Sequence, residues 1–251
     1  MLNKFRLAMS GAIHALAKPR LNGLIFAKNR FGCYCIPAEA SHRPAPKSII
    51  AGKVWEPETI AYCLGHANSG DIVTAGAFFG DSLPAFSAVA GQNNTVWAFE
   101  PNPENFRCAS ITVLLNDLKN VRLVNAGLGA QSGASEIVIR DFSGRSLGGA
   151  SQIVGTVDST GQKRGDTSVP VEIVAIDDIV PETRTVSLIQ LDVEGFEEFA
   201  ILGAAKTIAR CRPKLILEYG PKEGSPAKKL LNDLGYSVTR RLDSENFLLE
   251  C

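Results

Sequence analysis

Short apolar runs alternate with longer runs of helical character in two stretches of this chain. A strand followed by a helix and another strand is typical of a parallel sheet with right-handed crossovers. The predicted strands are 72–75, 95–100, 121–125, 186–191 and 214–218, and the predicted helices are 56–64, 81–90, 104–116, 196–210 and 227–234. We therefore predict an α/β fold, a mostly parallel sheet with helices on both faces, which ends with paired strands over 236–241 and 246–250.

Residues 129–175 interrupt this alternation. Segments 136–140 and 169–174 alternate apolar and polar side chains, as half-exposed strands do. Six glycines between positions 144 and 165 indicate loop structure. We predict that 129–175 is an inserted β-hairpin or lid over the cleft of the sheet. The predicted organisation is an N-terminal extension over 1–69, which packs on the core, and a main domain over 70–251.

Composition limits the class of protein. The chain has 251 residues, of which 45% are hydrophobic and 21% are charged, and this suits one α/β domain with a substantial core. The formal net charge is zero, but residues 1–38 contain six basic and no acidic side chains and so carry +6. No basic and aromatic stripe accompanies the neutral core, so we expect no nucleic-acid partner.

The basic N-terminal arm has three interpretations. It can be an irregular extension packed on the domain, a weak peripheral contact with an anionic membrane, or an organelle transit peptide. No apolar run reaches the ~18 residues of a transmembrane span. The six cysteines include one close pair, Cys33 and Cys35, which is too few for a zinc site and consistent with reduced thiols. We expect a soluble, cytoplasmic protein, and the sequence leaves its oligomeric state open.

Acidic side chains gather where the predicted strand 186–191 ends. Asp192 and Glu194 follow it directly, and Glu197 and Glu198 come shortly after. Burying a carboxylate is costly unless the group is paired, so acids at a strand end indicate a functional cleft. Open α/β sheets bind their ligands at this carboxyl edge.

A glycine turn and an acid follow the first two strands of the main domain. Gly76 and Gly80 bracket the turn after strand 72–75, where glycine permits a sharp bend and the close approach of a ligand. The next helix start offers N–H groups to a carboxylate or phosphate. Glu100 ends the second strand 20 residues after Gly80, the offset at which nucleotide-binding folds hold a ribose. Asn125 ends the third strand, where its amide is placed to bind the base.

The glycine turn also bears on the class of cofactor. A dinucleotide fingerprint needs Gly-x-Gly-x-x-Gly to seat a pyrophosphate, and the run Thr74-Ala-Gly-Ala-Phe-Phe-Gly-Asp81 lacks the first close glycine pair. The chain has no Walker lysine either. S-adenosylmethionine carries a carboxylate in place of the pyrophosphate and needs only one tight approach. The residues therefore favour S-adenosylmethionine over a nicotinamide cofactor.

In combination, these motifs resemble the FkbM-type S-adenosylmethionine-dependent methyltransferases. The matching pieces are Gly76-Ala-Phe-Phe-Gly-Asp81, Ala98-Phe-Glu-Pro-Asn-Pro-Glu-Asn105, Asn125-Ala-Gly-Leu-Gly129, Leu191-Asp-Val-Glu-Gly-Phe-Glu197 and Pro213-Lys-Leu-Ile-Leu-Glu218. The resemblance implies the Rossmann-like, seven-stranded methyltransferase fold over 70–251 and methyl transfer, usually to an oxygen of a sugar or secondary metabolite. The cofactor-binding residues that we predict are Gly76, Ala77, Gly80, Asp81, Glu100, Asn102, Asn125 and Asp192.

Two positions depart from the family pattern. Thr74 stands where members usually carry Asp, which helps to hold the methionine amino group, and Phe78 stands where they usually carry Asn. Asp71 lies at the far end of the strand and cannot replace the missing Asp. Asp81, at the helix start, is the candidate to do so. These departures keep two alternatives open: a non-catalytic docking module and, more remotely, a nicotinamide-dependent oxidoreductase.

The strand-end acids are the candidates for catalysis. Asp192 is predicted to be the general base or the acid that orients the acceptor, with Glu194 as the second choice and Glu218 as the third. Glu194 has an alternative structural role as a cap of the following helix. We predict no metal ligands. We expect a small-molecule or glycan acceptor, whose identity is set by the lid and the N-terminal loops.

Overall fold

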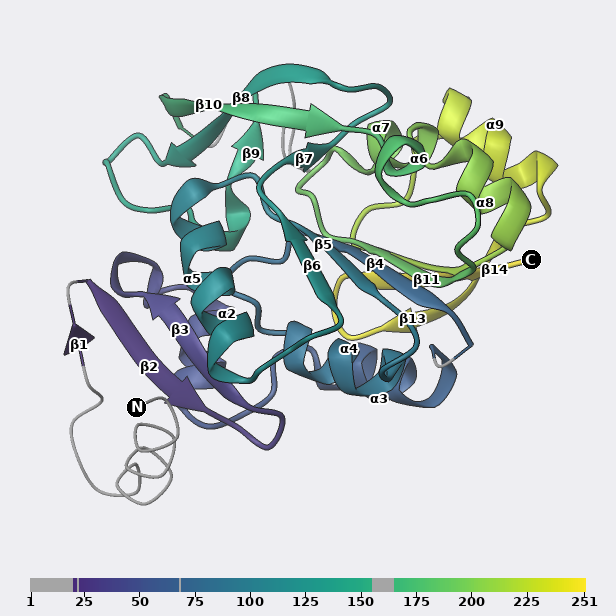
Figure 1. Ribbon diagram of the computed structural model, residues 1–251. Coiled ribbons are helices and arrows are strands. Elements are labelled where there is room, and N and C mark those ends of the chain that lie inside the picture. The colour runs from purple at the N-terminus through teal and green to yellow at the C-terminus, as the bar shows by residue number, and fades with distance from the viewer. Residues whose placement is uncertain (1–19, 22, 68, 155–164) are drawn as a thin grey trace.

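A seven-stranded sheet forms the centre of the protein (Figure 1). The computed structural model describes residues 20–21, 23–67, 69–154 and 165–251. The strands lie in the order β13-β14-β12-β11-β4-β5-β6. Their bounds are β4 Asp71–Ala75, β5 Val96–Phe99, β6 Val121–Val124, β11 Val186–Leu191, β12 Lys214–Leu217, β13 Ser237–Leu242 and β14 Asn246–Glu250. The strands from β12 to β6 are parallel, and β14 is antiparallel to both of its neighbours. The predicted α/β fold and its seven strands are confirmed.

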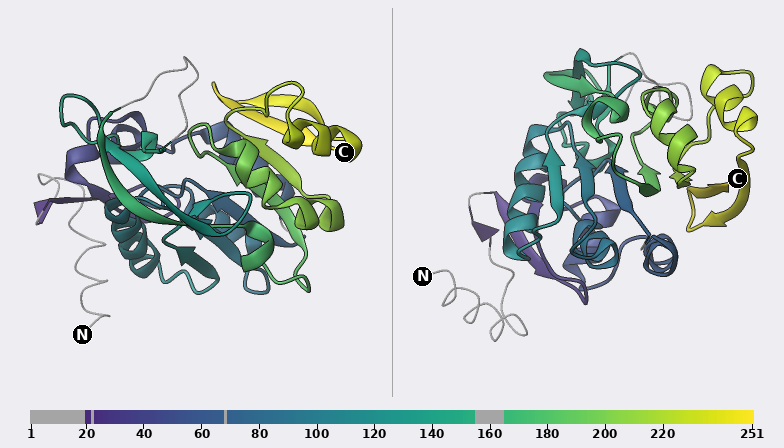
Figure 2. Two further views of the ribbon diagram at one scale, coloured as in Figure 1. Left: turned by 90° about the horizontal axis from the view of Figure 1, so that it is seen from above. Right: turned by 45° about the vertical axis from the view of Figure 1, so that its right-hand side comes forward.

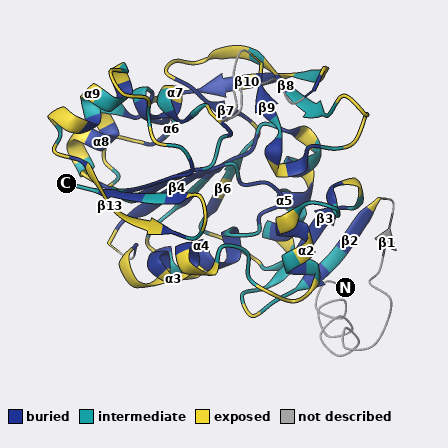
Figure 3. Cartoon of the chain, turned by 180° about the vertical axis from the view of Figure 1, so that it is seen from behind, coloured by how far each residue is buried: buried dark blue, intermediate teal, exposed yellow. Residues whose placement is uncertain are grey.

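Helices cover both faces of this sheet, as predicted (Figure 2). Side chains alternate along a strand, so that Ile72 and Val73 of β4 belong to cores on opposite faces. One core includes α3 (Pro57–His66) and α4 (Leu83–Ala90). The other core includes α6 Ile176–Ile179, α7 Glu197–Leu202, α8 Ala205–Cys211 and α9 Pro226–Asp233. The central strands are buried between these layers (Figure 3). Among the described residues, no helix combines the length and the apolar character that crossing a membrane requires.

Two predicted segments differ from the structure. The helix predicted over 196–210 is divided into α7 and α8 at Gly203 and Ala204. A Cβ atom at Gly203 would lie 1.9 Å from the carbonyl oxygen of Gly129, so this contact between two backbones requires glycine. No helix was predicted before residue 56, but the structure has one there, α2 (Pro44–Ile50). Its prolines lie in the first turn, where a missing N–H costs no hydrogen bond.

The N-terminal segment forms an antiparallel sheet of three strands. These are β1 Arg20–Leu21, β2 Leu24–Lys28 and β3 Cys33–Pro37. β3 packs on α5 (Pro103–Leu115), where the Thr112 hydroxyl accepts the Cys35 N–H at 3.0 Å and donates to the Phe79 carbonyl at 2.8 Å. These bonds tie the segment to the main sheet. Most of the basic arm, residues 1–19, lies outside the described residues, and the domain boundary after residue 69 stays a prediction.

A four-stranded sheet from residues 127–174 lies over the carboxyl edge of the main sheet (Figure 1). Its order is β7-β10-β8-β9. The bounds are β7 Gly127–Leu128, β8 Gly133–Arg140, β9 Gln152–Ile153 and β10 Thr167–Val174. β8 and β10 pair antiparallel, so the predicted hairpin is confirmed. Residues 155–164 of the predicted lid lie outside the described residues.

Candidate active site

The carboxyl edge of the main sheet has a switch point between β4 and β11. The chain leaves β4 for β5 and β6 on one side, and later enters β11 and β12 on the other. Such a point opens a crevice for ligands in α/β sheets. Gly76 and Asp192 follow the two strands; Gly76 has a φ of +81°, and a Cβ atom there would lie 1.8 Å from the Asp192 carbonyl oxygen. The close approach of the two strand ends therefore requires glycine at position 76.

The N–H groups of the glycine turn donate hydrogen bonds to carbonyl groups of the protein itself. The N–H groups of Gly76 and Ala77 both donate to the Phe99 carbonyl, at 3.1 and 3.0 Å. Gly80 has a φ of +82°, and its N–H donates to the Ala77 carbonyl at 2.7 Å. The turn after β4 is thus a rigid floor for the crevice, made by its own backbone hydrogen bonds.

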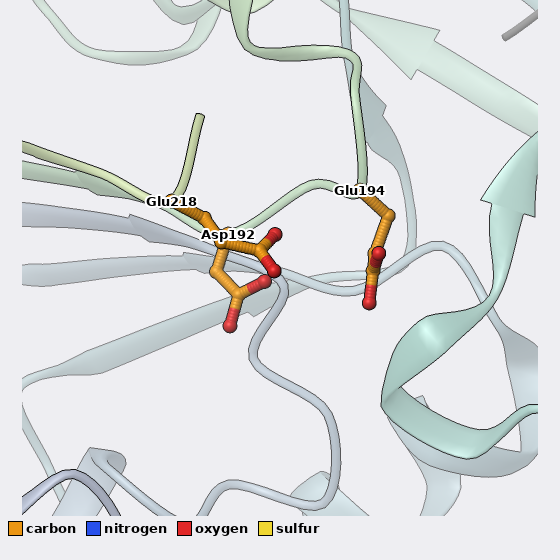
Figure 4. A group of neighbouring side chains, drawn as sticks. All are labelled: Asp192, Glu194 and Glu218. Carbon is orange, nitrogen blue, oxygen red and sulfur yellow. The ribbon is translucent and has the colours of Figure 1, made fainter. Parts of the chain in front are cut away.

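Three carboxylates lie together at this edge: Asp192 and Glu194 after β11, and Glu218 after β12 (Figure 4). Each offers a carboxylate oxygen within 4.8 Å of those of the other two. Because the carboxyl groups of Asp192 and Glu218 are this close, ionisation of one disfavours ionisation of the other. Burial first, and then the negative charges of Glu218, Glu56 and Glu194, raise the pKa of Asp192 well above its usual range. Carboxylates at this spacing suit a cationic group, either of an organic ligand or a divalent metal ion.

These carboxylates line a cavity of about 200 Å³. Glu56, Asp81 and Glu245 add three more acids to its lining, and Arg43 is the only cationic side chain among the described residues that line it. Burial raises the pKa of Asp81 to about 6 and, with help from the Asp81 charge, that of Glu56 to about 7. A lining with this excess of acids favours a ligand that is cationic or donates hydrogen bonds.

A second hollow of about 30 Å³ lies beside the cavity, at the ends of β5 and β6. Glu100 and Leu128 line it, and it shares Gly76, Asp192 and Glu194 with the larger cavity. A volume of this size holds about one water molecule. The two hollows form one crevice along the switch point, and its β5 end is closed.

The segment around β9 closes this end. Asn102 donates from Nδ2 to the Ser151 hydroxyl at 3.0 Å, and Gln152 donates from Nε2 to the Glu194 carbonyl at 3.2 Å. Both bonds hold residues 148–152 over the smaller hollow. This segment must therefore move before a ligand the size of a nucleoside enters.

Glu100 lies at the end of β5 as predicted, buried beside the smaller hollow. One of its oxygens accepts the Phe78 N–H at 2.8 Å. The other accepts the Asn102 N–H at 2.9 Å and the Asn105 amide at 3.3 Å. Burial raises the pKa of Glu100 to about 7, against the hydrogen bonds, which lower it. Both oxygens are thus engaged by the protein, and a contact between Glu100 and a ribose stays a prediction.

The two asparagines that we predicted to bind the cofactor form hydrogen bonds mainly with nearby backbone groups. Asn102 is the N-cap of α5, where its side-chain oxygen accepts the Glu104 N–H at 3.0 Å. Asn125 is exposed, and its amide donates to the carbonyls of Glu100 at 2.8 Å and Pro101 at 3.2 Å. These bonds fix the chain after β5, and a role of either asparagine in cofactor binding stays a prediction.

The two departures from the family pattern have clear structural surroundings. Thr74 is buried in β4, and its hydroxyl donates to a glutamine side chain of β11. Phe78 has a φ of +47°, and its ring packs under Gly149, where a Cβ atom would lie 3.0 Å from the ring. Asp71 begins β4, at the opposite end from the crevice. Asp81 lines the larger cavity and offers the carboxylate that Thr74 and Asp71 do not.

Some residues of the site were not predicted, or have a different role from the one expected. Glu197, which we grouped with the cleft acids, accepts the N–H groups of Val193 at 3.2 Å and Gly195 at 3.4 Å and so fixes the start of α7. Glu56 and Thr59 line the cavity although no motif contains them. The one signal was Pro57, which marks a helix start and so places both residues at one end of α3.

A sequence profile described as the methyltransferase FkbM domain matches residues 74–238. Similar solved structures include methyltransferase FkbM from Methylobacillus flagellatus KT, with 19% identity, a TM-score of 0.48 and coverage of 72% of this chain and 43% of that chain. An S-adenosylmethionine-dependent methyltransferase from Aquifex aeolicus has 15% identity, a TM-score of 0.40 and coverage of 78% and 88%. Aeropyrum pernix fibrillarin in complex with S-adenosylmethionine has 11% identity, a TM-score of 0.43 and coverage of 94% and 97%.

The chain spans less than half the length of the Methylobacillus protein. Among proteins with curated descriptions, none matches this chain. The profile match, by contrast, covers more than half of the chain and runs from β4 to β13. It contains the glycine turn, Glu100 and the three strand-end carboxylates, so the resemblance seen in the sequence is confirmed. The chain belongs to the FkbM methyltransferase domain family.

Proposed function

We propose that this protein transfers a methyl group from S-adenosylmethionine to a hydroxyl of a small-molecule or glycan acceptor, such as a sugar or a secondary metabolite. The observation that carries the proposal is the crevice of the family domain, in which the carboxylates after β11 and β12 meet the glycine turn after β4. The donor lies across the switch point in this proposal, and the acceptor occupies the larger cavity.

The residues of the crevice fit this donor. S-adenosylmethionine carries a sulfonium and an ammonium cation, and Asp81, Asp192 and Glu194 supply carboxylates along the cavity. Glu100 is beside the smaller hollow, on the side that the nucleoside would take. That side has room for the nucleoside only after residues 148–152 move. The carboxylates of the crevice therefore suit S-adenosylmethionine. Entry of this cofactor depends on movement of the segment around β9.

The chain's own residues align the acceptor and manage its proton. When bound, S-adenosylmethionine supplies a methyl carbon that the acceptor oxygen attacks in line with the carbon–sulfur bond, whose electron pair stays on sulfur. Asp192 lines both hollows, so it lies where donor and acceptor meet. Because burial and nearby carboxylates raise the pKa of Asp192, we assign it the orientation of the acceptor hydroxyl, with Glu194 as a second contact.

Calorimetric titration tests the cofactor assignment. We expect the purified protein to bind S-adenosylmethionine and S-adenosylhomocysteine and to leave NAD unbound, because the glycine turn lacks a pyrophosphate site. Methyl transfer from labelled S-adenosylmethionine to a panel of hydroxylated sugars then tests the activity. Binding of NAD alone would instead support the oxidoreductase alternative.

A second candidate function is a docking module without catalysis. The observations that favour it are the closed β5 end, with its hollow of about 30 Å³, and the absence of a carboxylate at Thr74. If neither adenosyl compound binds at millimolar concentration, this candidate replaces the methyltransferase.

The state of the cysteines bears on the cellular compartment of the protein. All six cysteines are free thiols, and Cys35, Cys63 and Cys108 are buried. Free thiols are typical of a reducing compartment, so we propose the cytoplasm. Weak membrane contact through the basic N-terminal arm, most of which lies outside the described residues, stays a prediction.

A further inference from the structure

One wall of the larger cavity comes from the segment before β4. Arg43, Trp55, Glu56 and Thr59 line this wall, and all four precede the matched family segment 74–238. The strand-end acids on the facing wall lie within that segment. The cavity thus combines a wall from the family domain with a wall from outside it. Side chains on such an added wall are placed to select the acceptor.

Glu56 has a backbone conformation that helix capping does not explain. It precedes α3 with φ +45° and ψ 62°, a left-handed conformation uncommon for residues with a Cβ atom. Its side chain makes no capping bond; instead Asp243, between β13 and β14, accepts the N–H groups of Glu58 at 3.3 Å and Thr59 at 2.7 Å. The Glu56 side chain lines the cavity, beside the Asn246 amide. The strained turn therefore directs a carboxyl group to the cavity.

Thr59 contributes a buried hydroxyl. Its side chain is 2% exposed and lines the same cavity. Within the part of the chain that the structure describes, the hydroxyl oxygen has no hydrogen-bond partner. Buried polar groups nearly always have a partner, so the orphaned hydroxyl points to a ligand that supplies one.

The rest of the lining restricts the chemical class of that ligand. Trp55 offers an aromatic face, and Ile60 and Phe86 offer apolar surface, as in sites for small ring compounds. Six carboxylates and one arginine from the described residues line the cavity, so this lining accepts hydrogen bonds and repels anions. A neutral sugar ring donates hydrogen bonds from several hydroxyls. A sugar phosphate would be repelled.

We propose that Glu56 and Thr59 form the acceptor subsite for a neutral, sugar-like polyol. Glu56 accepts the proton of the hydroxyl that becomes methylated, and the Thr59 hydroxyl bonds a neighbouring hydroxyl of the same ring. The inference rests on the proposed methyl transfer. In that step the acceptor oxygen forms a bond to the methyl carbon, the carbon–sulfur bond breaks with its electron pair left on sulfur, and the O–H proton passes to Glu56.

The groups around Glu56 suit this role. Burial, followed by the charge of Asp81, raises its pKa to about 7, so the carboxylate form is available near neutral pH. A hydrogen bond with Asn246 opposes this rise, and the charges of Asp243 and Glu218 make smaller contributions to it. The pKa of Asp192, by contrast, is raised well above its usual range by burial and by neighbouring carboxylates, so less of it is in the carboxylate form that could accept a proton. Other groups that face Glu56 or line the cavity with it are Asn246, Arg43, Glu194 and Glu245.

The test uses the full chain and a matched pair of variants on one helix end. Methyl α-glycosides of glucose, galactose, mannose and fucose, with glucose 6-phosphate for contrast, are titrated into protein loaded with S-adenosylhomocysteine. We expect binding of at least one glycoside and none of the phosphate. With the bound glycoside as acceptor, Glu56→Gln lowers kcat about 100-fold and removes the rise of kcat near pH 7, with S-adenosylmethionine affinity unchanged. Glu58→Gln, an exposed carboxyl outside the cavity, keeps the wild-type kcat.

Thr59→Val separates a substrate contact from a structural role. We expect KM for the glycoside to rise about tenfold with kcat retained, because one hydrogen bond to the acceptor is lost. The melting temperature stays the same or rises, since the hydroxyl has no protein partner to lose. A lower melting temperature would overturn the Thr59 assignment.

The remaining outcomes are equally distinct. A wild-type kcat in Glu56→Gln would overturn the Glu56 assignment, and binding of no neutral glycoside would overturn the acceptor class. Either result leaves methyltransferase function intact if S-adenosylmethionine still binds. Failure of the wild-type protein to bind S-adenosylmethionine would overturn the proposed function itself, and with it this inference.

Discussion

The two ends of the crevice differ in how their carboxylates are satisfied. Glu100, at the β5 end, accepts hydrogen bonds from two backbone N–H groups and one amide. Asp192 and Glu218, at the β11 and β12 end, lie against each other and line the larger cavity together with Glu56. One end is held closed by protein hydrogen bonds, and the other is an open cavity with an excess of acids. If the proposed function is correct, the acceptor end receives its ligand as it stands, whereas the cofactor end requires a movement.

This difference couples binding to motion. The bonds from Asn102 to Ser151 and from Gln152 to the Glu194 carbonyl must break before the nucleoside side opens. A binding-competent state that is only partly populated lowers the apparent affinity by its population. We therefore expect the closed end to set cofactor affinity and the acidic end to set the chemistry. Variants at the two ends should separate these effects.

The largest expected effect is on turnover at the acidic end. Asp192→Asn keeps the shape of the side chain but removes the carboxylate to which we assign the orientation of the acceptor hydroxyl, so we expect methyl transfer to fall about 1,000-fold, or about 4 kcal/mol. S-adenosylmethionine affinity should change by less than about threefold, because several other carboxylates remain along the cavity. Rates with labelled S-adenosylmethionine and calorimetry measure the two quantities.

Glu198→Gln is the matched control for Asp192→Asn. Glu198 lies close in sequence but outside the cavity lining, so its variant should keep the wild-type rate. If Asp192→Asn retains more than about a tenth of the wild-type rate, the acidic end does not set the chemistry.

A substitution at the opposite edge of the sheet, far from the crevice, should lower stability without a direct effect on catalysis. The Asp71 carboxylate is buried, pairs with Arg184 and accepts bonds from the Thr95 N–H and the Trp97 indole, both at 2.8 Å. Asp71→Ala leaves these donors unpaired, so we expect the free energy of unfolding to fall by about 3 kcal/mol. Urea unfolding at pH 7 measures the loss, and cofactor affinity at low temperature should be unchanged.

The direction of the pKa shift of Asp71 determines how its contribution to stability depends on pH. Although burial is the largest influence and raises it, bonds to Arg184, Thr95 and Trp97 together leave the pKa of Asp71 below its usual value. The stabilisation is therefore present above the unfolded-state pKa near 4 and is lost as the pH falls through the lower folded value. A variant that loses the same stability at pH 3 as at pH 7 would contradict this account of the ion pair.

Much of the fold could be predicted from the sequence because local pattern and tertiary burial agree there. The strands of the main sheet appeared within a residue or two of their predicted ends. The break between α7 and α8 could not be predicted, because it depends on contact between Gly203 and Gly129, which are distant in sequence. Helix α2 was not predicted because its sequence is short and contains two prolines, which are compatible with a helix only in its first turn.

The candidate site also contains some residues that the sequence could place and others that it could not. Asp192, Glu194 and Glu100 could be placed because residues that follow parallel strands meet at one edge. The reason for glycine at position 76 could not be predicted, since it is the carbonyl of Asp192. Glu56 was also out of reach, because only the packing of α3 brings the segment before β4 to the cavity.

A smaller effect should appear in the pH dependence of stability. The pKa of Glu56 is raised from 4.5 to about 7, chiefly by burial. A raised pKa means that the protonated form stabilises the fold fully below 4.5, and that this stability is lost as the pH rises through 7. Glu56→Gln cannot ionise, so relative to wild type it should gain about 2 kcal/mol between pH 5 and pH 8. Urea unfolding at both pH values measures the gain, and Glu58→Gln should show none.

The smallest predicted effect tests the closed end directly. Ser151 accepts the Asn102 amide at 3.0 Å and donates to the Gly148 carbonyl at 2.7 Å. Ser151→Ala removes the bond to Asn102, which joins residues 148–152 to the chain after β5 in the closed arrangement, so the open arrangement becomes more populated by about 0.5–1.5 kcal/mol. We expect S-adenosylmethionine to bind about two- to tenfold more tightly, with faster association, as measured by calorimetry and stopped flow. Ser143→Ala, on an exposed loop outside both hollows, should leave affinity unchanged. Weaker binding by Ser151→Ala would mean that this hydroxyl contacts the cofactor, and that the closed end is part of the binding site instead of a barrier to it.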